Sequence, residues 1–119
     1  MIFEGLKTNL ASLSSSLTDL DLSANKTWWA GEAGLDNMRL LCSSISECAN
    51  LKRFNFSDNN AHDQVMAQLL TTMSSSQQLL ASLSVVMLDG NSFECPDCHS
   101  PLAEFAALST ALTSISIEN

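Results

Sequence analysis

Four short segments of the chain repeat one pattern of apolar and polar positions. Each places an apolar residue at its first, fourth and sixth positions, and three of them place Asn at the ninth. The segments are LTDLDLSAN from Leu17, LKRFNFSDN from Leu51, LSVVMLDGN from Leu83 and LTSISIEN from Leu112, and they begin 34, 32 and 29 residues apart. Alternation with a period of two is typical of a strand with one buried face. We therefore expect strands near residues 19–23, 53–57, 85–89 and 114–117.

Between these strands the apolar residues recur with the helical period of about 3.6. One such face consists of Leu35, Met38, Leu41, Ile45 and Cys48. Two more consist of Val65, Met66, Leu69, Leu70 and Met73, and of Leu102, Phe105, Leu108 and Leu112. A further face, upstream of the first strand, consists of Phe3, Leu6, Leu10 and Leu13. A helix that connects two neighbouring strands of one sheet makes those strands parallel. The sequence therefore predicts about four strand-turn-helix units around a shared core.

The repeated pattern resembles the leucine-rich repeat, L-x-x-L-x-L-x-x-N, and the long spacing is similar to that of the ribonuclease-inhibitor type. The resemblance covers nearly the whole chain. It implies an α/β leucine-rich-repeat solenoid, a horseshoe segment with the parallel sheet on its concave side and the helices on its convex side. The uneven repeat lengths look more like tropomodulins and CARMIL-type regulators, which are cytoskeletal, or Ran GTPase-activating proteins, than ribonuclease inhibitors and immune receptors. The motif residues do not separate these subfamilies.

The Asn at the ninth position stands where the backbone leaves each strand. Its amide can pair turn N–H and C=O groups that would otherwise be buried without a partner. We therefore expect Asn25, Asn59 and Asn91 to form a buried ladder in the stacked repeats.

Residues 1–119 are expected to form one domain, a segment of a longer array. A stack of repeats needs polar caps, and neither end of the sequence has the pattern of one. The last strand, with Ile115 and Ile117, would then be covered by further repeats or by another chain.

Thirteen acidic against five basic residues give the chain a formal net charge of −8. Nucleic acids and anionic membranes attract clustered Lys and Arg, so this charge argues against both as partners. It favours a protein partner with a basic patch, or serves only to keep the chain soluble. No apolar run is long enough to span a bilayer, and MIFEGLKTNL lacks the apolar core of a signal peptide. The expectation is a cytoplasmic location without membrane insertion.

The strand positions that alternate with the buried ones would form the concave wall of the sheet. This wall is expected to consist of Asp19, Asp21 and Ser23; Arg53, Asn55 and Ser57; Val85, Met87 and Asp89; and Ser114 and Ser116. Because strands lie about 4.8 Å apart, Arg53 would sit between Asp19 and Val85, within reach of Asp19 or Asp21. Leucine-rich repeats typically bind other proteins through this wall, so the resemblance implies a non-enzymatic interaction scaffold, regulatory or cytoskeletal in role. Alternatively, these side chains are merely solvated.

Two adjacent tryptophans, Trp28 and Trp29, lie in the long connection after the first strand. Trp is a frequent anchor of protein interfaces, so the pair could contact a partner. The alternative is that both rings pack on the repeats beside them.

The motif Cys95-Pro-Asp-Cys98-His99 follows the third strand, and its spacing can hold two thiolates on one zinc ion. His62, in the matching loop of the preceding repeat, would be a fourth ligand. The usual second cysteine pair is missing, however, so the alternatives are a local disulfide or redox pair, or reduced loop cysteines. We expect no bound metal and no cofactor.

Few residues in the sequence suggest catalysis. It contains two histidines and lacks both a Gly-rich phosphate loop and a G-x-S-x-G motif. Arg53 alone is too little to predict an arginine finger. The chain is therefore predicted to be non-enzymatic, with two alternatives: a GTPase-activating or other catalytic accessory module, and a zinc-stabilised repeat module.

Overall fold

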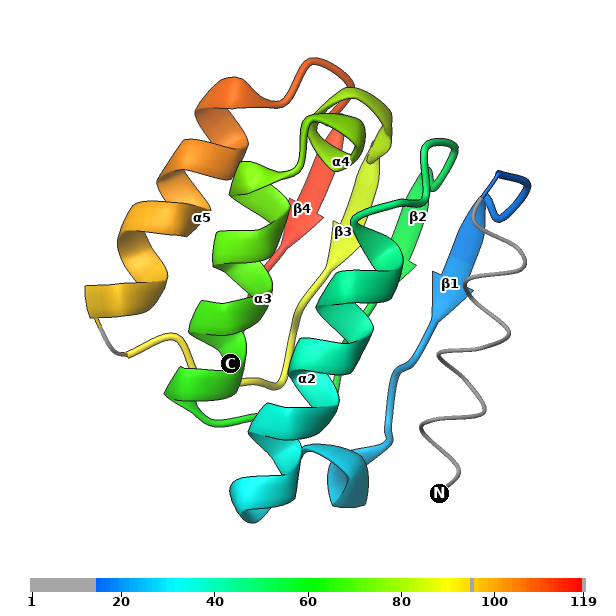
Figure 1. Ribbon diagram of the computed structural model, residues 1–119. Helices are drawn as coiled ribbons and strands as arrows, with labels where there is room; N and C mark the ends of the chain where they lie inside the picture. Colours follow the sequence, from blue (N-terminus) through cyan, green and yellow to red (C-terminus); the bar gives the residue numbers. More distant parts are fainter. Residues whose placement is uncertain (1–14, 95, 119) are drawn as a thin grey trace.

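Four parallel strands form one sheet in the order of the sequence. A computed structural model describes residues 15–94 and 96–118, and in it the sheet consists of β1 (Asp19–Asp21), β2 (Arg53–Asn55), β3 (Val85–Met87) and β4 (Ser114–Ser116) (Figure 1). The strands are shorter than expected, but backbone bonds continue beyond them: the Leu22 amide donates to the Asn55 carbonyl at 2.8 Å. The predicted parallel sheet is confirmed.

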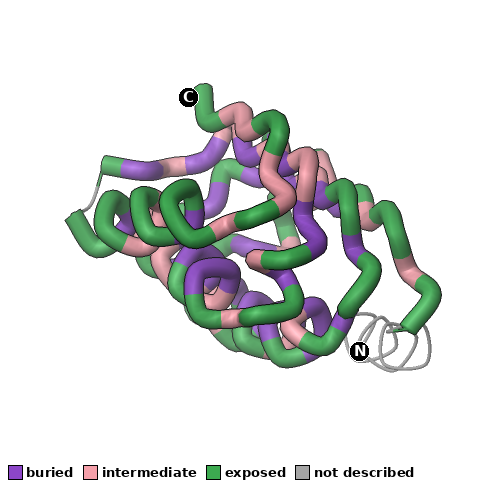
Figure 2. Tube along the Cα trace, turned by 90° about the horizontal axis from the view of Figure 1, so that it is seen from above, coloured by how far each residue is buried: buried purple, intermediate pink, exposed green. Residues whose placement is uncertain are grey.

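Helices cover one face of this sheet. They are the 3-10 helix η1 (Lys26–Trp29) and the α-helices α2 (Gly31–Ile45), α3 (Asp63–Ser75), α4 (Gln77–Ser82) and α5 (Pro96–Leu108). The view from above shows the helices gathered in one layer and the strands in another (Figure 2). Each of the first three strands is thus followed by one or more helices, as the change of period predicts. No described residue covers the opposite face of the sheet.

The core lies between the two layers, and α3 contributes most evenly to it. All five residues of its expected face are fully buried: Val65, Met66, Leu69, Leu70 and Met73. In α2, Met38, Leu41 and Ile45 are buried, whereas Leu35 is half-buried. Cys48 is buried as well, but α2 ends at Ile45, so this thiol packs from the following turn.

The last helix departs from its expected face. Phe105 is fully buried, whereas Leu108 is 55% exposed, and Leu112 lies beyond the end of α5. A middle helix such as α3 has a helix on each side, whereas only α3 lies beside α5 in the described residues (Figure 1). The prediction that Leu108 belongs to the core is therefore wrong. The expected helix with Phe3, Leu6, Leu10 and Leu13 lies outside the described residues.

The sixth position of the repeat shows the same end effect in the strands. Phe56 and Leu88 are fully buried at this position and Leu22 is 5% exposed, but Ile117 is 40% exposed. The same pattern position is therefore buried in the first three repeats and exposed in the last one.

The turns after the first three strands have a left-handed backbone at the eighth position of the pattern. Ala24, Asp58 and Gly90 occupy it with φ of 59°, 60° and 72°. At Gly90 a side chain would also meet its neighbour, because an added Cβ would lie 3.0 Å from the Asp58 Cα. A Gly satisfies both the dihedral angle and the close approach.

Candidate functional site

Asparagine side chains join the repeats at the ends of the strands. The Asn59 amide nitrogen donates to the Phe56 carbonyl of its own repeat at 2.9 Å and to the Leu22 carbonyl of the preceding repeat at 3.1 Å. The Asn59 amide oxygen accepts from the Asn25 backbone N–H at 2.6 Å. The chain after each strand is therefore held at a fixed position relative to the next repeat.

Asn91 repeats this arrangement one unit further on. Its amide nitrogen donates to the Leu88 carbonyl at 3.0 Å and to the Phe56 carbonyl at 2.9 Å. Its oxygen accepts from the Ala61 N–H at 3.0 Å. Asn59 and Asn91 are buried, whereas Asn25, in the first repeat, is half-buried. The three amides thus form hydrogen bonds within and between the repeats. These bonds fix the positions of the strand ends relative to one another.

The face of the sheet opposite the helices, here called the open face, carries two rows of side chains. Asp19, Arg53, Val85 and Ser114 are in register in the first row, and Asp21, Asn55, Met87 and Ser116 in the second. The Arg53 Nε lies 3.9 Å from the Asp19 Oδ2, with both side chains more than half exposed. Arg53 therefore sits between Asp19 and Val85, as the register argument predicts.

A cleft of about 200 Å³ lies on the open face between the first three strands. Its lining combines two carboxylates, one guanidinium, one amide and apolar surface, contributed by Asp19, Leu20, Asp21, Arg53, Asn55 and Met87. These groups can accept and donate hydrogen bonds, and at the same time the apolar side chains can contact a small apolar group of a bound molecule. They are suited to recognition of a side chain.

Asp21 is held in one orientation at the edge of this cleft. Its Oδ1 accepts from the Ser23 N–H at 2.9 Å and from the Ser23 hydroxyl at 2.6 Å. These two bonds, the hydroxyl first, lower the pKa of Asp21, so its carboxylate is ionised at neutral pH. No bond from a described residue is found on Oδ2, which can accept from another molecule.

Ser57 and Asp89, both expected on the wall, are buried or hydrogen-bonded within the protein. Ser57 is buried, so it is not part of the open face. Asp89 is half-buried, and its carboxylate accepts from the Ser116 hydroxyl at 2.6 and 2.8 Å and from the Glu118 N–H at 2.6 Å. Asp89 therefore attaches the last strand to the third. Their position in the pattern alone could not show these contacts.

The tryptophan pair divides between core and surface. Trp29 is 1% exposed and packs edge-on against Phe56, with ring centroids 4.7 Å apart. Trp28 is half-buried beside it, and the Trp28 carbonyl accepts from the Asn37 amide at 2.7 Å. Trp29 is thus a core residue and not an accessible anchor, which leaves Trp28 as the member of the pair that reaches the surface.

The candidate metal ligands do not converge in the described part of the chain. Cys98 is buried and its thiol donates to the Asp63 carbonyl at 3.5 Å. The His99 Nε2 lies 2.9 Å from the Phe93 carbonyl, which can only accept, so this nitrogen carries the proton. His62 is exposed at the start of α3, and Cys95 lies outside the described residues. Among the described residues, no group of three or more His, Cys, Asp or Glu is placed to hold a metal ion.

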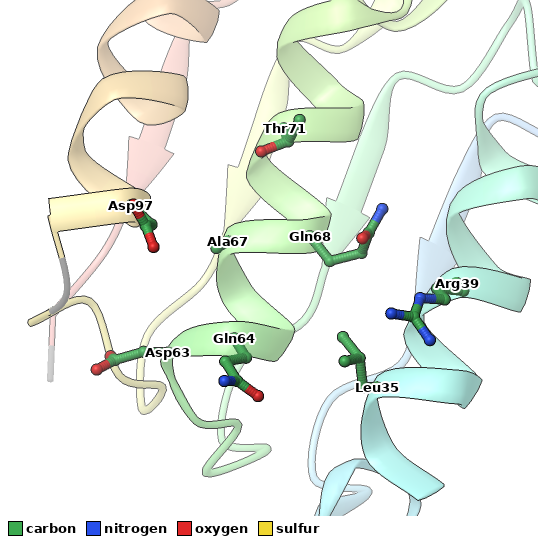
Figure 3. A pocket seen from close by; sticks show the side chains of 8 residues that line it. All are labelled: Leu35, Arg39, Asp63, Gln64, Ala67, Gln68, Thr71 and Asp97. Carbon is green, nitrogen blue, oxygen red and sulfur yellow. The ribbon is translucent and has the colours of Figure 1, made fainter. Parts of the chain in front are cut away.

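A second hollow of about 490 Å³ lies on the helical side (Figure 3). It is lined by Leu35, Arg39, Asp63, Gln64, Ala67, Gln68, Thr71 and Asp97. Gln68 on α3 and Arg39 on α2 extend into the gap between their helices, whereas Asp97 comes from α5, on the other side of α3 (Figure 3). Arg39 is already 3.3 Å from Asp36, and Asp63 accepts a hydrogen bond from Ser92. The sequence does not predict this hollow, because its lining residues form no motif and come from three helices.

Comparison with known proteins gives one similar structure. No family model and no curated protein matches the chain. Among solved structures, the tropomodulin C-terminal domain of Caenorhabditis elegans is similar, with a TM-score of 0.55 and 12% sequence identity, over 100% of this chain and 84% of that one. At this identity the likeness concerns the fold, and it supports the leucine-rich-repeat-like architecture. No helix among the described residues is long and apolar enough to cross a membrane.

Proposed function

We propose that the chain is a non-enzymatic protein-interaction scaffold of the leucine-rich-repeat type, and that a protein partner binds its open face. The observation that carries this proposal is the pair of rows across the sheet, which places carboxylates, a guanidinium, an amide and apolar side chains in register. In this proposal the sheet is the concave side of a solenoid segment. The likeness to a tropomodulin domain supports a cytoskeletal or regulatory role in the cytoplasm.

The ordered backbone that carries the side chains of the open face favours a binding role. The rows stand on parallel strands, and hydrogen bonds of buried Asn59 and Asn91 join each of these repeats to the preceding one. A surface that is already ordered loses little conformational entropy when it binds. In the hollow on the helical side, by contrast, Asp63 already accepts a hydrogen bond from Ser92.

The charge of the chain supports a partner with a basic patch. A net charge of −8 steers cationic surfaces toward the molecule, and Asp19 and Asp21 would receive them on the open face. A GTPase-activating role is not favoured, because Arg53 lies in the middle of the sheet beside Asp19.

The proposal is tested by capturing partners from a cell lysate on the immobilised chain. The open-face variant carries Asp21→Ala and Arg53→Ala. The matched control carries Gln68→Ala and Thr71→Ala, two changes on the helical side. We expect the wild type and the control to retain the same partner and the open-face variant to lose it, with circular dichroism showing that all three are folded. Equal recovery by the open-face variant would remove the open face from the proposal.

A further inference from the structure

We infer that the partner segment on the open face is an α-helix lying across the strands, with a basic, an acidic and an apolar side chain on successive turns. This inference rests on the proposed function of the open face and adds the chemistry of the ligand. It follows from two properties of the sheet: the spacing of its strands, and the order in which they present charge.

The spacing favours a helix over an extended peptide. Neighbouring strands lie about 4.8 Å apart, and one helical turn rises about 5.4 Å, so one side chain per turn can face each strand. Over two strands the mismatch is only about 1 Å. An extended peptide presents side chains on one face about every 6.8 Å, which accumulates a mismatch of about 4 Å over the same distance.

The order of charge across the sheet sets the order in the ligand. β1 presents Asp19 and Asp21, and β2 presents Arg53 with Asn55. The residues of β3 and β4 in the same rows are Val85 and Met87, then Ser114 and Ser116. The complement of these groups is a cation over β1, a carboxylate over β2 and an apolar side chain over β3. A polar residue suits the position over β4.

The cation has a place in the cleft beside Asp19 and Asp21. The Asp21 Oδ2 can accept from it, while the Ser23 bonds to Oδ1 keep the carboxylate in position. Asp19 is shared with Arg53 at 3.9 Å, and this exposed ion pair exchanges at little cost. When a ligand cation takes Asp19, the Arg53 guanidinium becomes available for a carboxylate one turn further along the ligand.

The apolar side chain would lie over Val85 and Met87. Both are half-buried and sit in register with the charged residues of β2. Met adapts its conformation to the shape of an apolar group, so this strand can accept Leu, Met or Phe. The β4 strand adds less, because the Ser116 hydroxyl already donates to Asp89.

The dipole of the ligand helix sets its direction. The positive end of a helix is its N-terminus, and negative charge stabilises it there. Asp19 and Asp21 are the carboxylates of the cleft, so the N-terminus of the ligand is placed over β1 and its C-terminus toward β4.

Designed peptides test the inference directly. The matched peptide is a capped, Ala-rich helix of about 15 residues with Lys, Glu and Leu at positions i, i+4 and i+7. In the control peptide Lys and Leu exchange places, which preserves composition and charge. With the matched peptide at about 1 mM, we expect NMR shifts of backbone amides in β1, β2 and β3, and binding about fivefold weaker with the control. Equal binding of both peptides, no shifts with either, or shifts confined to the helical side would overturn the inference.

A charge exchange identifies the contact over β1. Asp19→Lys should weaken binding of the matched peptide about five- to tenfold, and replacing the peptide Lys by Glu should restore it. Glu47→Lys is the matched control, because it makes the same change of charge at an exposed residue after α2, away from the open face. An equal effect of Glu47→Lys, or no recovery with the Glu peptide, would contradict the assigned contact.

The two experiments separate this inference from the proposed function. If lysate capture depends on the open face but neither peptide binds, the scaffold role stands and the helical ligand is wrong. If capture does not depend on the open face, the proposed function and the helical ligand are both wrong.

Discussion

Asn59 shows how a single side chain can join two repeats. Its amide nitrogen bonds to one carbonyl in its own repeat and to one in the preceding repeat, and its oxygen accepts a backbone N–H. All three backbone groups lie at the ends of strands, where no regular ladder bond would pair them. The amide therefore contributes both to stability and to the relative position of the strands.

Asn59→Ala is expected to lower the free energy of unfolding by about 2 kcal/mol. The Asn25 N–H would lose its partner, and the Leu22 and Phe56 carbonyls would each lose a buried hydrogen bond. Asn25→Ala is the control and should cost less, because Asn25 is half-buried and water can replace its amide. Urea denaturation of both variants measures the difference, and similar losses would contradict the role of the ladder.

The carboxylate of Asp21 should titrate below the ordinary range of aspartate. The Ser23 hydroxyl and N–H bind its charged form and lower its pKa. Such a group stabilises the fold fully above the unfolded pKa, and this stabilisation is lost as the pH falls through the lowered folded value. NMR titration of the Asp21 side chain should show the low pKa and its rise in Ser23→Ala. A pKa that does not change in this variant would show that the hydroxyl bond is not the cause.

At the scale of elements, burial depends on which repeats lie beside the element. α3 lies between α2 and α5, and every residue of its expected apolar face is buried. α5 has a comparable pattern, but Leu108 at its end remains exposed. The periodicity predicts which residues share a face, whereas the neighbours decide how completely that face is covered.

Truncations at the same pattern position should therefore have different costs in different strands. Leu88→Ala removes a fully buried side chain and is expected to cost about 2 to 5 kcal/mol. Ile117→Ala, at the sixth position of the last copy, should cost less than about 1 kcal/mol, because Ile117 is already 40% exposed. Chemical denaturation of the two variants provides the comparison. A large loss at Ile117 would mean that another surface covers it in solution.

At the scale of the molecule, negative charge is spread widely and seldom compensated. The chain has thirteen acidic against five basic residues, and the described residues form two ion pairs, both exposed. Repulsion among like charges destabilises a compact chain, and salt screens it.

The thermal unfolding midpoint should therefore rise when NaCl is increased from low ionic strength to about 0.5 M. Glu47→Lys reduces the net negative charge at an exposed position, so this variant should show a smaller rise. Differential scanning calorimetry at several NaCl concentrations measures how the midpoint of each protein depends on salt. A midpoint that is independent of salt in the wild type would show that self-repulsion is not significant.

The sequence alone determined the repeated strand, the helix between strands and the parallel order of the sheet. It did so because apolar spacing reports the period of each element, and Leu20, Phe54, Val86 and Ile115 keep that spacing in every copy. It also predicted which rows of side chains share the open face, including the place of Arg53 beside Asp19.

Only the tertiary structure decided which of these side chains are available to a partner. Ser57 and Trp29 are buried, and Asp89 bonds to Ser116 and Glu118, although their pattern positions resemble those of exposed residues. The physical reason is that the residues in contact lie far apart in the sequence. A contact such as that between Trp29 and Phe56 joins different repeats, and the local alternation of apolar and polar residues carries no information about what the next repeat brings against it.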